Sequence, residues 1–150
     1  MPLEKEIPKS YFRNPRHKTL VNIIFTSNYI LERLKQFLEN EDITHQQYNI
    51  LRILNNSEAP LSTLQIREQM LDKMSDTSRI VERLLKKDLV NKQTCRNDKR
   101  LVDVTISEKG LHLLHRLEKK TYELDSIVSN LTNEDADTLN QLLDKIREKE

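Results

Sequence analysis

The apolar positions between residues 71 and 106 change their period once, and this change marks the centre of the chain. Small and apolar residues first recur at steps of three and four, the period of an α-helix. They are Met74, Thr77, Ile80, Val81, Leu84 and Leu85. The spacing predicts a helix over residues 73–87 with this stripe toward a core. Asp72 is the expected N-cap, and Lys86 and Lys87 lie at the negative end of the helix dipole.

The stretch after this helix has the period of a β-strand. Val102, Val104 and Ile106 alternate with Leu101, Asp103 and Thr105, which predicts a strand over residues 101–106. Residues 89–95 are the expected partner strand, and Asn97-Asp98 supplies turn residues for a hairpin with a basic tip over residues 96–100. Asp88 is an unusual residue for the helix end, because Gly and Asn adopt the left-handed conformation more readily.

Two capping boxes precede this region. Thr44 with Gln47 opens a helix to about Asn55, and Ser62 with Gln65 opens a short helix to Met70, after a minimal strand at Leu61. The short helix and the helix over residues 73–87 form a helix-turn-helix. With the hairpin behind it, the pattern over residues 44–106 predicts a winged helix-turn-helix.

Long amphipathic helices are predicted on both sides of this module. One covers residues 16–39, one runs from the cap Ser107 to about Val128, and one begins at Thr132. Gly110, in the first turn of the second, is expected to allow close packing. Residues 1–15 contain three of the four prolines and are predicted to form an extended, loosely ordered arm.

Length and composition favour one domain that completes its core in a dimer. The 150 residues are 36% hydrophobic and 33% charged, which is little apolar material for a self-sufficient monomer. The expected fold is mainly α with a small β-hairpin wing, as a single domain over 1–150. Residues 16–40 and 107–150 are the expected dimerisation helices around the winged-helix module at 44–106.

The same composition argues against several classes of protein. One glycine is too few for a phosphate-cradling loop, and this disfavours nucleotide-dependent enzymes. A lone cysteine, Cys95, excludes an intrachain disulfide and a Cys-based zinc site. No apolar run approaches the roughly 18 residues of a membrane span. We therefore expect a cytoplasmic protein that is not an enzyme, has no cofactor and does not contact a membrane.

Positive charge is concentrated on the winged-helix module. Residues 73–100 hold nine Lys or Arg against four Asp or Glu, a local net charge of +5 in a chain whose total is +1, so the remainder carries −4. A basic surface of this kind is typical of phosphate binding. The helix face opposite the apolar stripe contributes Ser75, Asp76, Arg79, Glu82, Arg83 and Lys86.

Four short motifs follow one another along the chain, and their order is more specific than any one of them. They are Ser78-Arg79-Ile80-Val81-Glu82-Arg83-Leu84, then Lys86-Lys87-Asp88-Leu89-Val90, then Asp98-Lys99-Arg100, then Ser107-Glu108-Lys109-Gly110. In this order they resemble the recognition helix, its exit, the wing and the next helix start of the MarR family of bacterial winged-helix regulators. The similarity extends over about residues 19–147. Asp88 departs from it, because the family usually has Gly there, and so does the acid Asp76 on the presumed DNA face.

The resemblance implies a homodimeric transcription regulator, most simply a repressor, on a pseudo-palindromic double-stranded operator. The helix over residues 73–87 would enter the major groove and the wing the minor groove, where Asp98 would hold Arg100 in place. The expected DNA-binding residues are Lys73, Ser75, Asp76, Thr77, Arg79, Arg83, Arg96, Asp98, Lys99 and Arg100. The expected dimer-interface residues are Leu20, Ile24, Leu124, Val128, Leu139, Leu142, Leu143 and Ile146.

The resemblance further implies a small effector, often an aromatic carboxylate or phenol, bound between the dimer helices and the winged-helix module. No residue pattern identifies this ligand. Other interpretations stay open at this point. In one interpretation, the charged helix face is only solvated, and Glu82 pairs with Arg79 or Lys86. In another, the module binds an acidic protein instead of DNA. Cys95 as an oxidation sensor and a metal on His112 and His115 with Glu108 or Glu118 are weaker alternatives.

Overall fold

The computed structural model describes residues 2–94 and 102–148. Its helices are α1 (Pro15–Leu38), α2 (His45–Asn55), α3 (Thr63–Gln69), α4 (Thr77–Lys86), α5 (Glu108–Glu118), α6 (Thr121–Ser126) and α7 (Asn133–Arg147). Strands β1 (Leu61–Ser62), β2 (Val90–Thr94) and β3 (Val102–Ile106) form one antiparallel sheet in the order β1-β3-β2. Short 3₁₀ turns are η1 (Leu3–Lys5), η2 (Lys9–Tyr11) and η3 (Glu39–Glu41).

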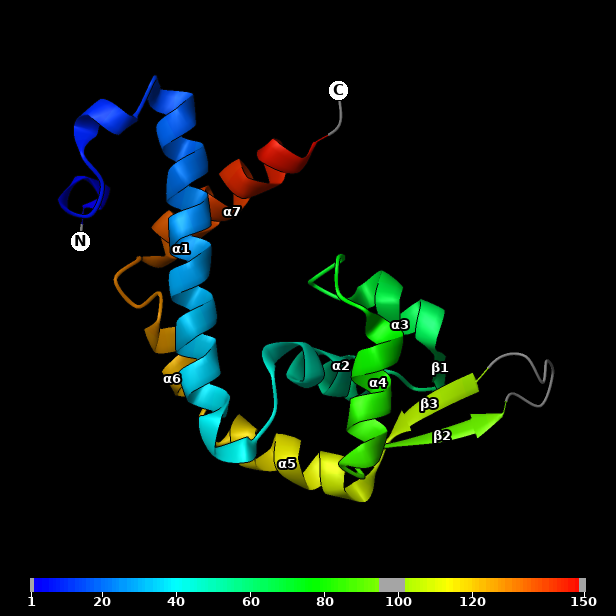
Figure 1. The fold of residues 1–150 in the computed structure, drawn as a ribbon. Helices are drawn as coiled ribbons and strands as arrows, with labels where there is room; N and C mark the ends of the chain where they lie inside the picture. Colours follow the sequence, from blue (N-terminus) through cyan, green and yellow to red (C-terminus); the bar gives the residue numbers. More distant parts are fainter. Residues whose placement is uncertain (1, 95–101, 149–150) are drawn as a thin grey trace.

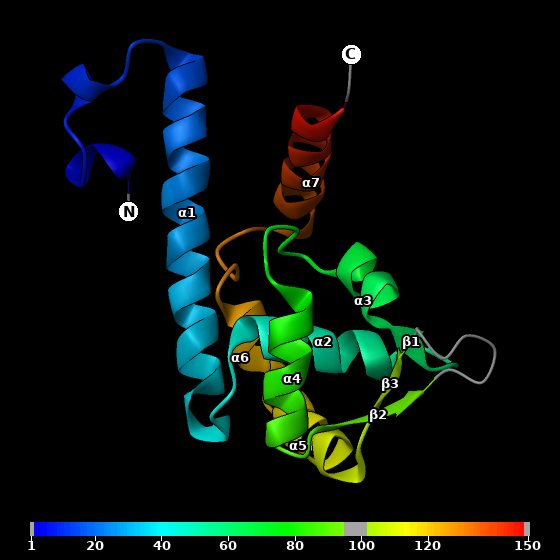
Figure 2. The same ribbon diagram turned by 45° about the vertical axis from the view of Figure 1, so that its right-hand side comes forward.

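The winged-helix module and the terminal helices are arranged differently in space. Helices α2, α3 and α4 gather against the small sheet, and α5 runs beneath them (Figure 1). Helix α1 stands along one side of this module and contacts it through α2, while α6 packs against α1. Helix α7 extends away from the module on the side where α1 begins (Figure 2). The predicted fold class, a mainly helical winged helix-turn-helix with flanking helices, is confirmed.

Local hydrogen bonds explain why several helices begin where they do. Thr44 and Gln47 cap each other's backbone, with N–H donors 3.1 and 3.2 Å from the side-chain oxygens. Ser62 and Gln65 do the same for α3 at 2.8 and 3.2 Å. Each pair satisfies two backbone donors that a helix start would otherwise leave free. Both predicted capping boxes are confirmed, and Thr132 opens α7 through an equivalent box with an acid.

The core lies between α2, α4, α5 and the sheet. Its most buried members come from the module and from the adjoining ends of α1 and α5: Leu38, Ile50, Leu51, Ile66, Met70, Leu84, Val104 and Leu117. Gly110 of α5 is part of this packing, because a Cβ there would lie 2.3 Å from the Leu89 carbonyl oxygen and 2.8 Å from Ile106 Cγ1. The close packing predicted for Gly110 is confirmed.

Asp88 at the exit of α4 has φ 59°, the left-handed conformation that the sequence made unusual for this residue. Its carbonyl oxygen accepts a hydrogen bond from Ser107 Oγ at 2.7 Å, and the Leu89 carbonyl accepts from Ser107 N at 3.1 Å. Ser107 therefore joins the segment that follows α4 to the start of α5.

Two predictions about the terminal regions are wrong. The helix expected over 107–128 ends at Glu118 and restarts as α6 at Thr121, whose hydroxyl donates to the Glu118 carbonyl at 3.0 Å and competes with the helical pattern. The N-terminal arm is folded rather than extended. It forms η1 and η2, buries Leu3, and joins α1 through an ion pair between Glu4 and Lys18. The hydrogen bond from Lys18 lowers the pKa of Glu4.

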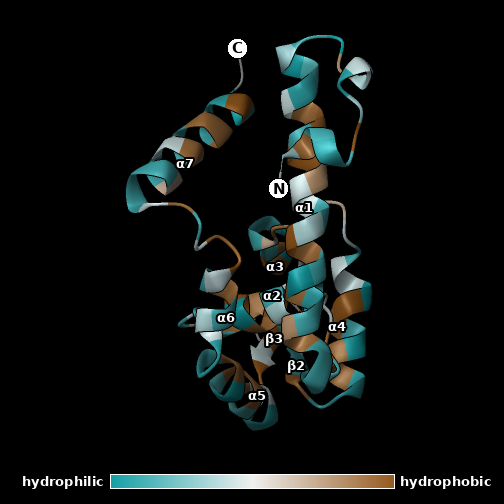
Figure 3. Ribbon diagram, turned by 90° about the vertical axis from the view of Figure 1, so that its left-hand side faces the viewer, coloured by the Kyte–Doolittle hydropathy of each residue, from teal (hydrophilic) through white to brown (hydrophobic). Residues whose placement is uncertain are grey.

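Hydrophobic and hydrophilic residues alternate along α1 and α7 (Figure 3), and several of their apolar side chains are exposed, among them Leu20, Ile24 and Leu142. Helix α7 buries none of its residues, and α1 buries only Phe37 and Leu38 at its C-terminal end. Within the described part of the chain, no helix has the length and apolar character needed to cross a membrane.

Candidate nucleic-acid interface

Helix α4 begins four residues later than the sequence predicted. Its N-cap is Asp76, whose carboxylate accepts a hydrogen bond from Arg79 N at 3.2 Å. Asp72, the predicted cap, instead lies in the preceding turn. Met74 was placed on the core stripe but is 93% exposed, so this prediction is wrong. Because the apolar spacing included Met74, the helix was predicted to start at residue 73 instead of Thr77.

The turn between α3 and α4 is held by a small network of hydrogen bonds. Asp72 Oδ1 accepts from Met74 N at 3.0 Å, and the Asp72 carbonyl accepts from Ser75 Oγ at 2.7 Å. Asn49 of α2 reaches this turn with its side-chain oxygen, which accepts from Leu71 N at 2.9 Å. The entry to α4 is therefore fixed from two sides, one of them a helix of the core.

Helix α4 presents a polar face to solvent and an apolar one to the core. Val81 and Leu84 are buried, whereas Ser78, Arg79, Glu82, Arg83 and Lys86 are exposed. Thr77 was predicted for both the core stripe and the DNA surface, and its side chain is in the core at 3% exposure. Burial of Thr77 argues against a base contact by its side chain.

One acid on this face has a partner outside the helix. Glu82 forms an ion pair with Lys92 of β2 at 2.7 Å, and not with Arg79 or Lys86, the partners that helical spacing allows. The pair connects α4 to the first strand of the wing. Among the described residues, the exposed guanidinium groups of Arg79 and Arg83 form no ion pair.

The wing begins as the alternating pattern predicted. Strands β2 and β3 pair antiparallel, with Val90 opposite Ile106 and Thr94 opposite Val102. Strand β1 pairs on the other edge of β3, with Leu61 opposite Val104. The tip residues predicted to bind DNA, Arg96, Asp98, Lys99 and Arg100, lie outside the described residues, as does Cys95.

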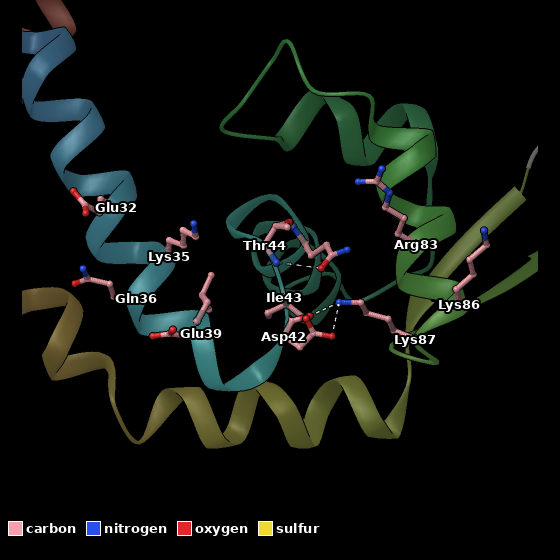
Figure 4. Close-up of a pocket in the computed structure, with 12 residues that line it drawn as sticks. Glu32, Lys35, Gln36, Glu39, Asp42, Ile43, Thr44, Arg83, Lys86 and Lys87 are labelled. Carbon is pink, nitrogen blue, oxygen red and sulfur yellow. Dashed lines mark hydrogen bonds and ion pairs between the residues drawn. The ribbon is translucent and has the colours of Figure 1, made fainter.

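The C-terminal end of α4 faces an open hollow of about 810 Å³ toward α1 and the start of α2. Figure 4 shows Arg83 pointing from α4 into this space and Lys35 pointing into it from α1. Lys87 donates to the backbone carbonyl of Asp42 and lies 3.4 Å from its carboxylate. Lys87 thus has a structural role at the C-terminal end of α4.

A second cavity of about 580 Å³ lies between α1, α2, α6 and the turn before α4. Its wall is largely apolar, with Ile30, Leu31, Leu34, Tyr48, Met70, Leu71, Leu124, Ile127 and Val128. Its polar side chains include His45, Asn49 and Arg52, and the Arg52 guanidinium lies 5.8 Å from the centre of the Tyr48 ring. Asn49 therefore both lines this cavity and supports the entry to α4.

The residues predicted for the dimer interface fall into two groups. Six are exposed apolar side chains on the terminal helices or the segment before α7: Leu20, Ile24, Val128, Leu139, Leu142 and Ile146. Leu143 is half-buried, and so is Leu124, which packs against the core of its own chain. The exposed group is available to a second copy. Leu124 is already partly used within one subunit.

Sequence reasoning missed two features of this surface. Asn49 gave no signal, because its contact lies 22 residues away in the chain. Thr63 and Arg67 of α3 flank the hollow of about 480 Å³ that also borders Ser75, in the turn before α4, and Ser78, in its first turn. Their position beside α4 follows from the helix-turn-helix and could have been predicted from the sequence.

The alternative of a metal site on His112 and His115 finds no support in the described residues. His112 and His115 border a shallow hollow with Glu108 and Glu118. Within residues 2–94 and 102–148, however, no three His, Cys, Asp or Glu side chains are grouped closely enough to hold a metal.

The arrangement of α2, α3 and α4 with the sheet defines a winged helix-turn-helix protein, with a basic helix and a wing on one surface. The model of the MarR family matches residues 43–102. Over these residues the chain is similar to the MarR family of transcriptional regulators, as its motifs predicted.

Individual relatives agree with this similarity. The HTH-type transcriptional repressor IacR of Pseudomonas putida is 28% identical over 117 residues, which cover 77% of this chain and 69% of that protein. A mutant of Escherichia coli MarR complexed with operator DNA shares the fold with a TM-score of 0.77 at 20% identity, over 99% of both chains. Bordetella bronchiseptica BpsR, whose DNA binding is regulated by 6-hydroxynicotinic acid, gives 0.74 at 17% identity over 87% of this chain and 99% of that one.

Proposed function

We propose that this protein is a homodimeric, sequence-specific DNA-binding repressor that a small molecule releases from its operator. The exposed basic face of α4, joined to the wing through Glu82 and Lys92, is the observation that carries the proposal. IacR is a repressor, and the E. coli MarR relative was solved on operator DNA. A regulator of this kind acts in the cytoplasm, where the operator lies.

Helix α4 is proposed to enter the major groove with its N-terminal end leading. Ser75, Asp76 and Arg79 then lie nearest the base edges, and Lys73 and Arg83 contact phosphates. This assignment is supported by the exposure of all these side chains except Ser75, which is half-buried. Thr77 at most supplies its backbone N–H to a phosphate at the helix start.

The wing is proposed to occupy the flanking minor groove. Arg100 would insert its guanidinium where the negative potential of a narrow groove is enhanced, with Asp98 holding it, and Arg96 and Lys99 would contact phosphates. The described part of the wing supports this, because β2 and β3 lead from α4 toward the tip without a break in register.

A second copy of the chain is proposed to cover the exposed apolar side chains of α1 and α7. These include Leu20, Ile24, Leu139, Leu142 and Ile146, each between 43% and 59% exposed. Monomeric proteins rarely leave apolar patches of that kind in water. A two-fold dimer places two copies of α4 about one helical turn of DNA apart, roughly 10 bp, on a pseudo-palindromic site.

The cavity between α1, α2 and α6 is proposed to bind the effector, a small aromatic carboxylate of the class to which the BpsR ligand belongs. Its apolar wall suits an aromatic ring, and Arg52 offers a guanidinium for a carboxylate. A ligand that hydrogen-bonds Asn49 competes with the 2.9 Å bond to Leu71 N and loosens the entry to α4. Release of the operator complex on titration with 6-hydroxynicotinic acid would support this site.

The decisive experiment is binding of the purified protein to the duplex upstream of its own gene, titrated against salt, with a random duplex as control. We expect saturable binding, a clear preference for the upstream duplex, and a fall in affinity with salt whose log–log slope is about −0.9 per phosphate contact. Equal and weak binding to both duplexes would contradict the proposal and favour the alternative, a winged-helix module that binds an acidic protein.

A further inference from the structure

Met74 is a solvent-exposed apolar side chain in a hydrogen-bonded turn between α3 and α4. It is 93% exposed, although it lies two residues before the N-cap Asp76 in the middle of the helix-turn-helix. Its backbone N–H donates to Asp72 Oδ1 at 3.0 Å, and the next residue, Ser75, donates twice to the Asp72 carbonyl, at 2.7 Å through Oγ and at 3.4 Å through N. The exposure of Met74 is thus a property of an ordered turn and not of a free chain end.

The hollow beside Met74 is mostly polar, whereas the exposed Leu71 of the same connection lines the cavity between α1, α2 and α6. The hollow that Met74 borders, between α3 and the start of α4, is lined otherwise by Leu64 and by polar side chains: Thr63, Arg67, Ser75, Asp76, Thr77 and Ser78. One leucine and one methionine among hydroxyl and charged groups do not make the broad apolar patch that a protein partner covers. Arg67 and the N-terminal dipole of α4 instead suit a polyanion.

We propose that Met74 is a specificity-determining residue that contacts the 5-methyl group of a thymine in each half-site. Base edges in the major groove present hydrogen-bond donors and acceptors, and the thymine methyl is their apolar feature. The residues at the start of the recognition helix are the ones that reach base edges. A methionine side chain, unbranched and adaptable, fits such a methyl closely. This inference rests on the proposed function.

The test replaces thymine by uracil in the operator, which removes the methyl group and keeps every base-pairing contact. Wild-type protein and the Met74→Ala variant are titrated with the upstream duplex and with duplexes that carry uracil at one thymine at a time. Leu64→Ala is the matched control, because Leu64 is 63% exposed across the same hollow but lies on α3, the helix that crosses the backbone. Thermal melting checks that all three proteins are folded.

For wild-type protein, uracil at one or more positions should weaken binding about fourfold per half-site, the value of one buried methyl group. Met74→Ala should bind the thymine operator more weakly by at least this factor and should lose the uracil penalty at that position. Leu64→Ala should keep the penalty. The proposal is overturned if Met74→Ala retains the full penalty at every position, or if wild-type protein shows none. Failure of wild-type protein to prefer its operator would instead reject the proposed function.

Discussion

The winged-helix module and the terminal helices use apolar residues in opposite ways. In the module, Ile50, Leu51, Ile66 and Leu84 are completely buried by elements that lie within about 70 residues of one another. In α7, an equally regular apolar stripe leaves Leu142 at 55% exposure. The periodicity is the same in both regions. The difference is whether the partner of the stripe is in the same chain.

This contrast separates the two tasks of the protein. The core of the module is completed within one chain, by Leu38 at the end of α1 and by Leu113, Leu114 and Leu117 of α5, so its outer surface is free to be basic and to face DNA. The terminal helices have apolar faces that a single chain does not cover, so in the proposed dimer their stability depends on association. Changes in the first region should therefore alter folding, and changes in the second should alter the oligomeric state.

The largest expected effect comes from placing charge in the proposed dimer interface. Leu139→Asp with Leu142→Asp should raise the dimer dissociation constant by at least about a thousandfold, or about 4 kcal/mol, because each carboxylate would be buried without a partner. Analytical ultracentrifugation measures the dimer, and operator binding should fall with it. A variant that remains a dimer would show that the interface lies elsewhere.

A core substitution should act on folding instead. Leu51→Ala leaves a cavity at a residue with 0% exposure and should lower the free energy of unfolding by about 2–5 kcal/mol. Leu142→Ala removes the same atoms from the exposed stripe and is the matched control. Urea unfolding at several protein concentrations distinguishes them, since the loss for Leu51→Ala should not depend on concentration. Equal losses at high dilution would contradict the contrast between the two regions.

Local signals in the sequence were sufficient for much of the fold. The side chains that cap α2 and α3 are adjacent to the helices they open, so both starts were correctly predicted. Period-two alternation likewise found β3 to within one residue. Errors arose where two local signals competed. Asp72 and Asp76 are both acceptable caps, and only packing of the turn, with Met74 outside the core, decides between them.

Other features depend on contacts that are distant in sequence. The break between α5 and α6 has no Gly or Pro, and the spacing from Leu117 to Leu124 continues a helical stripe across it. Asn49 reaches Leu71 across the core, and the cavity it lines is formed by three helices and a turn. No pattern within one element encodes such a site. The candidate DNA-binding residues of α4 were easier to predict from the sequence, because the helical period shows which side chains are exposed.

The wing should contribute to DNA binding without contributing to the dimer. Arg100→Ala should weaken operator binding by about 1–3 kcal/mol, a loss of roughly 5- to 150-fold, while the dimer stays intact. Arg100→Lys is an informative companion, because it keeps the charge but lacks the planar guanidinium. Fluorescence anisotropy at fixed salt measures both. An Arg100→Ala affinity equal to that of wild-type protein would remove the wing from the mechanism.

The smallest expected effect concerns Asp76, which has two separable roles. As N-cap, its oxygen accepts from Arg79 N, so Asp76→Ala should lower the free energy of unfolding by about 1 kcal/mol. Asp76→Asn keeps the accepting oxygen and should retain most of that stability, while it removes a negative charge beside the proposed DNA surface. Its affinity for random duplex should then rise a fewfold, because one repulsion with phosphate is lost. If Asn destabilises the protein as much as Ala does, the charge rather than the hydrogen bond stabilises the helix start.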